Sequence, residues 1–113
     1  MSEIPDIDIL PQLWRSVHDI LLGHVGGHEV RAIGSRARKT AKRHSGLDLL
    51  VMSAKVLPLE TTAALAEGFS QSDLALKVDV VDRAATSETL RRIIERDSVC
   101  VQQAEQRLDA ARP

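Results

Sequence analysis

The N-terminal part of the chain carries a helical pattern of apolar positions. From Leu10 to Leu21 the apolar residues recur three or four positions apart, which places their side chains on one face of a helix. Pro11 suits the first helical turn, because the N–H group that proline lacks would have no partner there. We expect Gly26 to end this helix in a left-handed conformation. Residues 1–9 are largely polar, and we expect them to be loose.

Three short apolar runs predict β-strands at residues 29–33, 47–52 and 76–81. The second run is interrupted only by Asp48, so we expect a central strand that is buried on both faces. The third run holds Asp79 in a similar position. Residues 36–44, between the first two runs, are too few and too charged for a crossover helix and predict a single turn followed by a loop.

Two further helices are indicated in the second half of the chain. The first extends from Pro58 to about Phe69. The second begins after Thr86 or Ser87, either of which can cap it, with Glu88 facing the positive end of the helix dipole. The side chains that this helix is expected to bury are Leu90, Ile93 and Ile94. Residues 99–101 continue the helix or form a short edge strand, and residues 102–113 are a polar tail.

These elements predict one α/β (α+β) domain over residues 1–113, with a small mixed β-sheet and helices packed on it. A chain of 113 residues fits a single hydrophobic core. Aromatic residues make up only 2% of the chain, so the core must be aliphatic. Trp14, on the apolar face of the first helix, is expected to lie in that core.

Charge is distributed unevenly, although the net charge is only −1. This balance favours neither a nucleic acid nor a membrane as a direct partner. One segment nevertheless holds six basic residues with no acid among them: Arg31, Arg36, Arg38, Lys39, Lys42 and Arg43. The only cysteine is Cys100, so no internal disulfide can form, and we expect a reducing compartment, most simply the cytoplasm. No apolar run approaches the roughly 20 residues that cross a bilayer.

The basic segment begins with Gly34 and Ser35, which predict a turn that exposes backbone N–H groups. Such N–H groups beside cationic side chains can hold phosphates, and Arg36 and Arg38 are candidate ligands. Asp48, on the strand that follows, can hold a divalent metal ion.

An unpaired carboxylate within an apolar strand costs several kcal/mol to bury. Asp48 and Asp79 therefore indicate either two metal ligands or two Asp–Arg ion pairs, and composition alone does not choose between these alternatives.

Four segments resemble the minimal nucleotidyltransferases of the DNA polymerase β superfamily, which pair with HEPN-domain toxins in bacterial and archaeal operons. The segments are Gly34–Ser35–Arg36, Ser45–Gly46–Leu47–Asp48–Leu49, the Val-Asp-Val-Val-Asp run at 78–82, and Ala85–Thr86–Ser87–Glu88. The resemblance covers residues 29–102. The Gly-Ser pair alone is a weak signal, but its spacing to the two acidic strands is specific.

The resemblance implies a fold, a reaction and a partner. Gly34 and Ser35 fall where the family binds the nucleotide phosphates. Asp48 and Asp79 fall at the positions of two catalytic acids in the family. In the family such acids hold two Mg²⁺ ions. Family members of this kind transfer AMP from ATP to a tyrosine of the HEPN toxin, which silences it.

Gly46 departs from the family pattern, because it stands where the first acid of an Asp-x-Asp pair is expected. Loss of about 4 kcal/mol of charge stabilisation would slow transfer by roughly three powers of ten. The chain is then a pseudoenzyme that neutralises its toxin by binding alone, an active variant that recruits water or another acid such as Glu60, or an altered sequence. Lys39 also departs, since the family usually has glycine there.

A third function, transfer of a nucleotide to a small molecule such as an antibiotic, is disfavoured. Enzymes of that kind resemble this unit with an added substrate domain, and the 113 residues leave no room for one.

Overall fold

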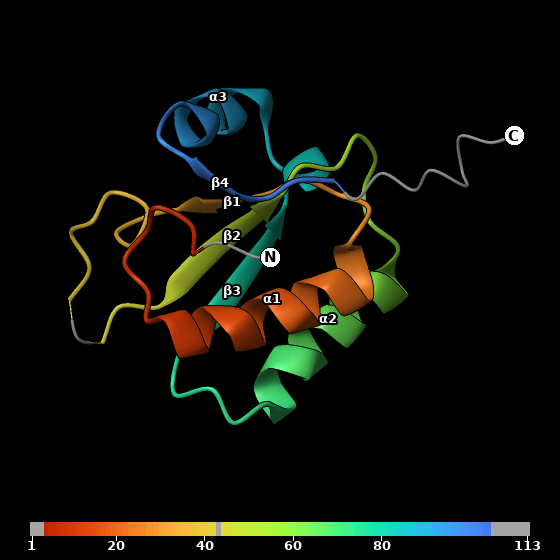
Figure 1. Ribbon diagram of the computed structural model, residues 1–113. Coiled ribbons are helices and arrows are strands. Elements are labelled where there is room, and N and C mark those ends of the chain that lie inside the picture. Colours follow the sequence, from red (N-terminus) through yellow and green to blue (C-terminus); the bar gives the residue numbers. More distant parts are fainter. Residues whose placement is uncertain (1–3, 43, 105–113) are drawn as a thin grey trace, which may run out of the picture.

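The computed structural model describes residues 4–42 and 44–104, apart from the side chain of Ile93. In chain order its elements are α1 (Pro11–Val25), β1 (Val30–Ile33), β2 (Leu47–Val51), α2 (Leu59–Gln71), β3 (Val78–Asp82), the short 3₁₀ helix η1 (Arg83–Ala85), α3 (Glu88–Arg96) and β4 (Val99–Gln102). Figure 1 shows these elements arranged around one sheet. The expected α/β class is confirmed.

The sheet is mixed, as the sequence predicts. Its strand order is β3-β2-β1-β4. β1 pairs antiparallel with β2 and with β4, whereas β2 and β3 pair in parallel. The alternative left open for residues 99–101 is therefore settled, because they form an edge strand. β2 is a central strand, as its apolar run indicates.

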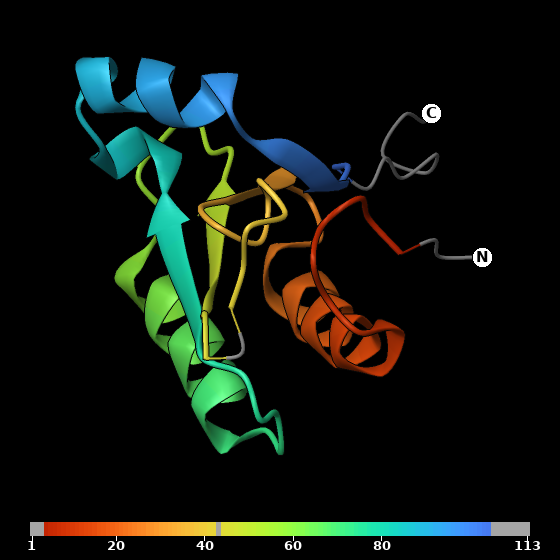
Figure 2. The same cartoon turned by 90° about the vertical axis from the view of Figure 1, so that its left-hand side faces the viewer.

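Helices α1 and α2 pack against one face of the sheet and enclose the aliphatic core (Figures 1 and 2). Alternate residues of β2 face this core, and α1 adds a stripe spaced three or four residues apart. The fully or almost fully buried members include Trp14, Val17, Leu21, Val25, Leu47, Leu49, Val51 and Leu65. Trp14 is thus a core residue, as expected. None of the described helices is long and apolar enough to span a membrane.

Helix α3 lies apart from α1 and α2, on the other side of the sheet (Figure 1). Ser87 caps it by accepting a hydrogen bond from the Leu90 N–H at 3.2 Å, as one of the two capping alternatives predicts. The expectation that the helix buries Leu90 is wrong, because that side chain is 46% exposed. Helix α3 has nine residues, and only one side of it faces the sheet. Ile94 is half-buried, whereas Leu90 is exposed.

Three boundary predictions need correction. Gly26 keeps a helical φ of −60° instead of a left-handed one, since the chain leaves α1 through a turn in which the His28 N–H donates to the Val25 carbonyl. Residues 4–9 are not loose throughout, because Ile7 is buried in the core. Gln102 is not part of a polar tail, since it is buried and donates to the carbonyls of Val25 and His28. Residues 105–113 of that tail lie outside the described residues.

Candidate active site

The Asp48 carboxylate packs directly against the Gly34 backbone. Gly34 follows β1 with φ of +83°, a conformation that L side chains rarely adopt. A Cβ atom at this position would lie 2.8 Å from the Asp48 Oδ2 atom. Glycine is therefore required at position 34 for two reasons. It permits the backbone bend, and it leaves the space that the Asp48 carboxylate occupies.

Asp79 lies beside Asp48 on the neighbouring strand. The two residues are direct partners in the parallel register of β2 and β3, so their side chains lie on the same face. Asp48 is half-buried and Asp79 is exposed. Neither makes an ion pair with any residue in 4–42 or 44–104. The described part of the chain thus shows no Asp–Arg pair that would explain these acids structurally.

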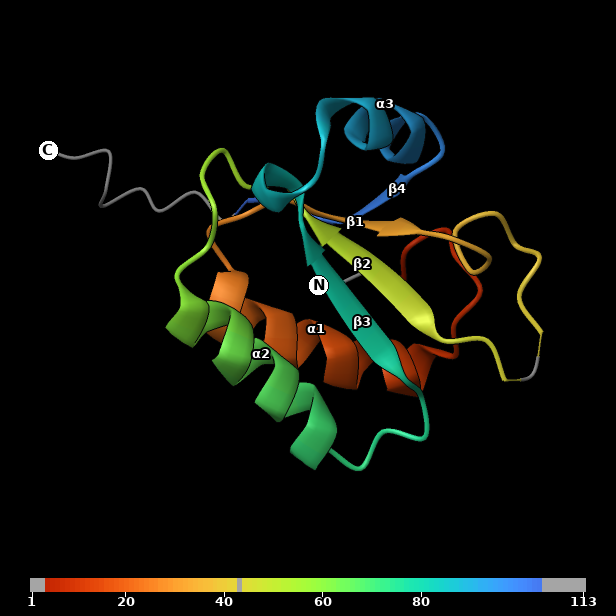
Figure 3. The ribbon, with the colours of Figure 1, turned by 180° about the vertical axis from the view of Figure 1, so that it is seen from behind.

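The basic segment starts as one helical turn at the end of the sheet where β2 and β3 begin (Figure 3). The Arg38 N–H donates to the Gly34 carbonyl at 3.1 Å, and the Thr40 N–H donates to the Ser35 carbonyl at 2.9 Å. Residues 36–42 and 44 therefore form a turn and a loop as predicted, and residue 43 lies outside the described residues. The N–H groups at the start of such a turn have no acceptor within it, which is the arrangement that binds anions.

Arg36 and Arg38 lie in different surroundings. The Arg36 guanidinium donates to the Ser45 carbonyl at 3.2 and 2.8 Å and to the Asp8 carbonyl at 2.6 Å. It therefore holds the loop to the start of β2. Arg38 is exposed and lines a hollow of about 150 Å³ together with Ile33, Gly34, Ile94 and Asp97. Of the two arginines, Arg38 is the one that shares a hollow with Gly34.

Lys39 adopts a left-handed φ of +60°, which explains why glycine suits this position in the family pattern. Its ammonium group pairs with Asp6. This hydrogen bond, together with the negative charge of Asp6, raises the pKa of Lys39. Lys39 thus attaches the turn to the N-terminal segment and stays charged.

Gly46 is enclosed by the backbone that precedes β3. A Cβ atom there would lie 3.0 Å from the Lys77 carbonyl oxygen and 3.6 Å from the Lys77 Cβ atom. The same carbonyl accepts a hydrogen bond from the Leu47 N–H at 2.8 Å. An aspartate at this position would therefore need a small shift of the Lys77 segment.

The acids present fit one bound cation. Among residues 4–42 and 44–104, no three His, Cys, Asp or Glu side chains come together as a possible metal site. Mg²⁺ is commonly held by one or two carboxylates together with water and substrate phosphates, and the adjacent, unpaired carboxylates of Asp48 and Asp79 match that donor set. Glu60, in the first turn of α2, belongs to the helix layer on the opposite face of the sheet and does not join them.

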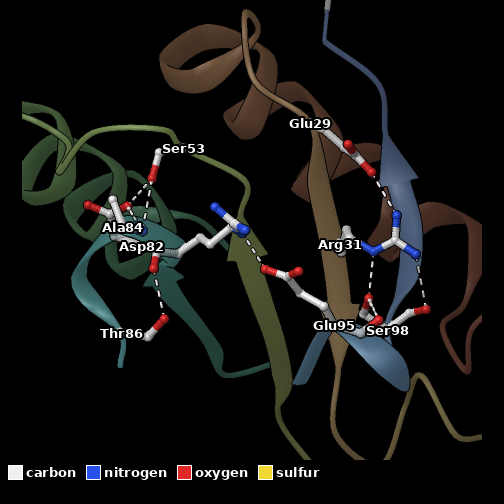
Figure 4. A network of polar contacts seen from close by, with 9 residues as sticks. Glu29, Arg31, Ser53, Asp82, Ala84, Thr86, Glu95 and Ser98 are labelled. Atoms are coloured by element: carbon white, nitrogen blue, oxygen red, sulfur yellow. Dashed lines mark hydrogen bonds and ion pairs between the residues drawn. The ribbon is translucent and has the colours of Figure 1, made fainter. Parts of the chain in front are cut away.

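A second acid of β3, Asp82, has a structural role. It accepts hydrogen bonds from the Ser53 hydroxyl and from the Ala84 N–H at 3.1 Å (Figure 4). The Leu57 N–H also donates to it, at 2.7 Å. Burial alone would raise the pKa of Asp82, but these hydrogen bonds outweigh it and hold the pKa below its ordinary value. Asp82 thus caps the η1 turn that follows it, whereas the sequence offers no signal for its long-range partners Ser53 and Leu57.

Two arginines connect α3 and β4 to the rest of the fold. Arg83 pairs with Glu95 of α3, and Arg31 of β1 donates to Glu29 and to Ser98 (Figure 4). Cys100 is half-buried on β4, where burial and then the nearby charge of Glu29 raise the pKa of its thiol. A raised pKa favours the thiol over the thiolate, which is the nucleophilic form.

Comparison with known protein families agrees with this geometry. Residues 28–107 match the family described as polymerase beta, nucleotidyltransferase, and this range includes the Gly34 turn and both acids. The chain belongs to the polymerase beta nucleotidyltransferase family.

A relative of this nucleotidyltransferase is known in Haemophilus influenzae. It is a probable protein adenylyltransferase, MntA, and is 37% identical over 109 residues, which cover 96% of each chain.

Solved structures share the nucleotidyltransferase fold. One is a crystal structure of a toxin–antitoxin pair with AMP-PNP (TM-score 0.66, 22% identity, covering 81% of this chain and 74% of the other). Another is the toxin–antitoxin pair MntA-HpeT, in a mutant with two aspartates changed to glutamate (TM-score 0.63, 20% identity, the same coverage).

Proposed function

We propose that this nucleotidyltransferase is the antitoxin of a HEPN-type toxin and that it transfers AMP from ATP to a tyrosine of that toxin. The H. influenzae relative is a probable protein adenylyltransferase, and the similar solved structures are toxin–antitoxin pairs, one of them with an ATP analogue. The chain itself contributes the contact of the Asp48 carboxylate with Gly34, in register with Asp79. This contact is the observation that carries the proposal.

The proposed reaction is an in-line displacement at the α-phosphorus of ATP. The tyrosine oxygen forms a bond to that phosphorus, the bond to the β-phosphate oxygen breaks, and pyrophosphate leaves with both electrons of the broken bond. Mg²⁺, when bound, would neutralise phosphate charge and favour the ionised acceptor oxygen. Asp48 and Asp79 would hold the ion through their carboxylates, and one of these carboxylates would take the phenolic proton.

The remaining residues of the site orient the nucleotide. We assign the N–H groups at the start of the Ser35 turn as donors for phosphate oxygens. Arg38 lies in the same hollow as Gly34, where its charge favours the triphosphate. Both belong to the short connection between β1 and β2.

The test is transfer of label from α-labelled ATP with Mg²⁺ to a co-purified HEPN toxin. We expect label on a toxin tyrosine and restored growth of cells that express both proteins. Absence of label, with an intact complex and bound ATP, would contradict the transfer reaction.

A second candidate function, neutralisation of the toxin by binding alone, is favoured by Gly46. This position has no carboxylate, and the Lys77 carbonyl oxygen closes on it. The variant Gly46→Asp distinguishes the two candidate functions by its rate of AMP transfer. Gly46→Asn is the control, because its side chain has nearly the same size and no charge. If the native protein transfers AMP slowly, the carboxylate variant should exceed the amide variant in rate. If native and Asp48→Ala proteins inhibit the toxin equally, binding alone suffices.

A further inference from the structure

A basic hollow of about 240 Å³ opens at the end of the sheet where β2 and β3 begin. Its lining residues are Arg36, His44, Ser45, Ala75, Leu76 and Lys77. Two of them, Arg36 and Lys77, carry positive charge at neutral pH, His44 becomes positive when protonated, and no acid lines the hollow. Within residues 4–42 and 44–104, neither His44 nor Lys77 makes an ion pair. Such a hollow attracts anions.

The basic hollow adjoins the two acids of the candidate active site. The Leu47 N–H donates to the Lys77 carbonyl, which is the ladder bond of the Leu47–Val78 pair, and Gly46 and Lys77 come next to each other just before that pair. Lys77 therefore precedes Asp79 by two residues of extended chain and lies on the same face of the sheet, roughly 7 Å away along the strand. A ligand that reaches the acids can thus also reach the Lys77 side chain.

Gly46 leaves the charge of the basic hollow uncompensated. A Cβ atom at position 46 would lie 3.6 Å from the Lys77 Cβ atom, so an acid there would neutralise the lysine. With glycine at this position, no carboxylate offsets the basic side chains among the lining residues. Charge neutralisation by a side chain can then replace neutralisation by a metal ion.

Arg36 is held in a fixed position at the wall of the basic hollow. Three of its N–H donors are used by the Ser45 and Asp8 carbonyls, and a guanidinium carries five. Its charge is therefore held in place before any ligand binds, which lowers the entropy loss on binding.

We propose that the basic hollow binds the terminal phosphates of a nucleoside triphosphate without a metal ion, with Lys77 and His44 as its adjustable contacts. The inference rests on the proposed function for the identity of the ligand as a nucleotide. The part of the phosphate chain near the sugar lies at the acids and the Gly34 turn, and the terminal phosphates lie in the basic hollow, where the charge of Lys77 offsets theirs.

The test is calorimetric titration of the full-length protein with tripolyphosphate in EDTA, which removes divalent ions. We expect the native protein to bind, and we expect Lys77→Ala to weaken binding by about tenfold, the effect of one charge-assisted hydrogen bond. His44→Ala should weaken it less, because the His44 ring offers fewer N–H donors than the Lys77 ammonium group. The matched control is Lys55→Ala, an exposed lysine of the β2–α2 connection, which should bind like the native protein.

Gly46→Asp provides an opposing readout. In EDTA it should weaken tripolyphosphate binding several-fold relative to Gly46→Asn, because a carboxylate beside Lys77 repels the anion. In the Mg²⁺-dependent transfer assay the same substitution should raise the rate. The two proposals are therefore tested separately. The transfer assay can contradict the proposed function while the titration in EDTA supports the anion site, and the opposite pair of results is equally possible.

Three results would overturn the inference. The first is absence of tripolyphosphate binding to the native protein in EDTA. The second is equal binding by Lys77→Ala and Lys55→Ala, with unchanged thermal melting of both variants. The third is failure of ATP to compete with tripolyphosphate while a short single-stranded RNA competes through Lys77, which would assign the basic hollow to a nucleic-acid backbone.

Discussion

Strand β3 carries acids near both of its ends, and the fold treats them in opposite ways. Asp82, at the C-terminal end, accepts hydrogen bonds from Ser53, Leu57 and Ala84, and its pKa is held low. Asp79, near the start, is exposed and lies beside Asp48, and neither has a cationic partner in the described part of the chain. The carboxylate with all its donors in place serves stability, whereas the two without partners remain available for a ligand.

The comparison shows that residue type alone does not identify a catalytic acid. All three residues are aspartates within apolar strands, and each would be expensive to bury without partners. What distinguishes them is whether the fold supplies donors. Three predictions test this distinction, beginning with the largest expected effect, and a fourth tests the backbone of the turn beside these acids.

Replacing Asp48 by asparagine should lower AMP transfer by at least about 10³-fold, because the amide cannot hold a metal ion as a carboxylate does. The melting temperature should stay within a few degrees of the native value, since no partner in the described residues depends on the charge. The measurement is the initial rate of labelling, with Asp73→Asn in the exposed α2–β3 loop as control. A rate within tenfold of native would contradict the assignment of Asp48.

Replacing Asp82 by alanine should lower the free energy of unfolding by about 2–3 kcal/mol, because three donors lose their acceptor in a partly buried site. Asp79→Ala should change it by less than about 0.5 kcal/mol, as is usual for exposed positions. Urea unfolding at pH 7 measures both. Equal losses in the two variants would remove the contrast between the two ends of β3.

The contribution of Asp82 should also depend on pH. Because its pKa is lower in the folded protein than in the unfolded chain, its stabilisation is fully present above the unfolded pKa and is lost as pH falls through the folded one. The stability gap between native protein and Asp82→Ala should therefore be widest near neutral pH and narrow below about pH 4. Urea unfolding at a series of pH values measures the gap, and a gap that widens toward acid would contradict the sign.

The smallest effect is expected at Lys39. Replacement by glycine relieves the left-handed backbone of a residue with a side chain but removes the exposed pair with Asp6. The net result should be a rise in melting temperature of about 3 °C. Lys42→Gly, an exposed lysine without a positive φ, is the control and should not raise it. A fall for Lys39→Gly would show that the Asp6 pair outweighs the backbone strain.

Local patterns in the chain predicted most elements correctly, because they reflect local physics. The spacing of apolar residues in α1 encodes one buried face, and Ser87 can accept a hydrogen bond from the first turn of α3 wherever that helix lies. The same approach fails at Leu90 and Gln102, whose exposure depends on which distant surface meets them.

The sequence by itself determined that Asp48 and Asp79 interrupt apolar strands, that glycine stands at positions 34 and 46, and that basic residues gather between them. Only the tertiary structure decided that β2 and β3 pair in parallel with the two acids in register, that Asp48 fills the space at Gly34, and that the Lys77 carbonyl closes on Gly46. The physical reason is distance along the chain. Strand register and backbone approach arise when segments 14 to 31 residues apart in sequence pack together, and no local preference records that packing.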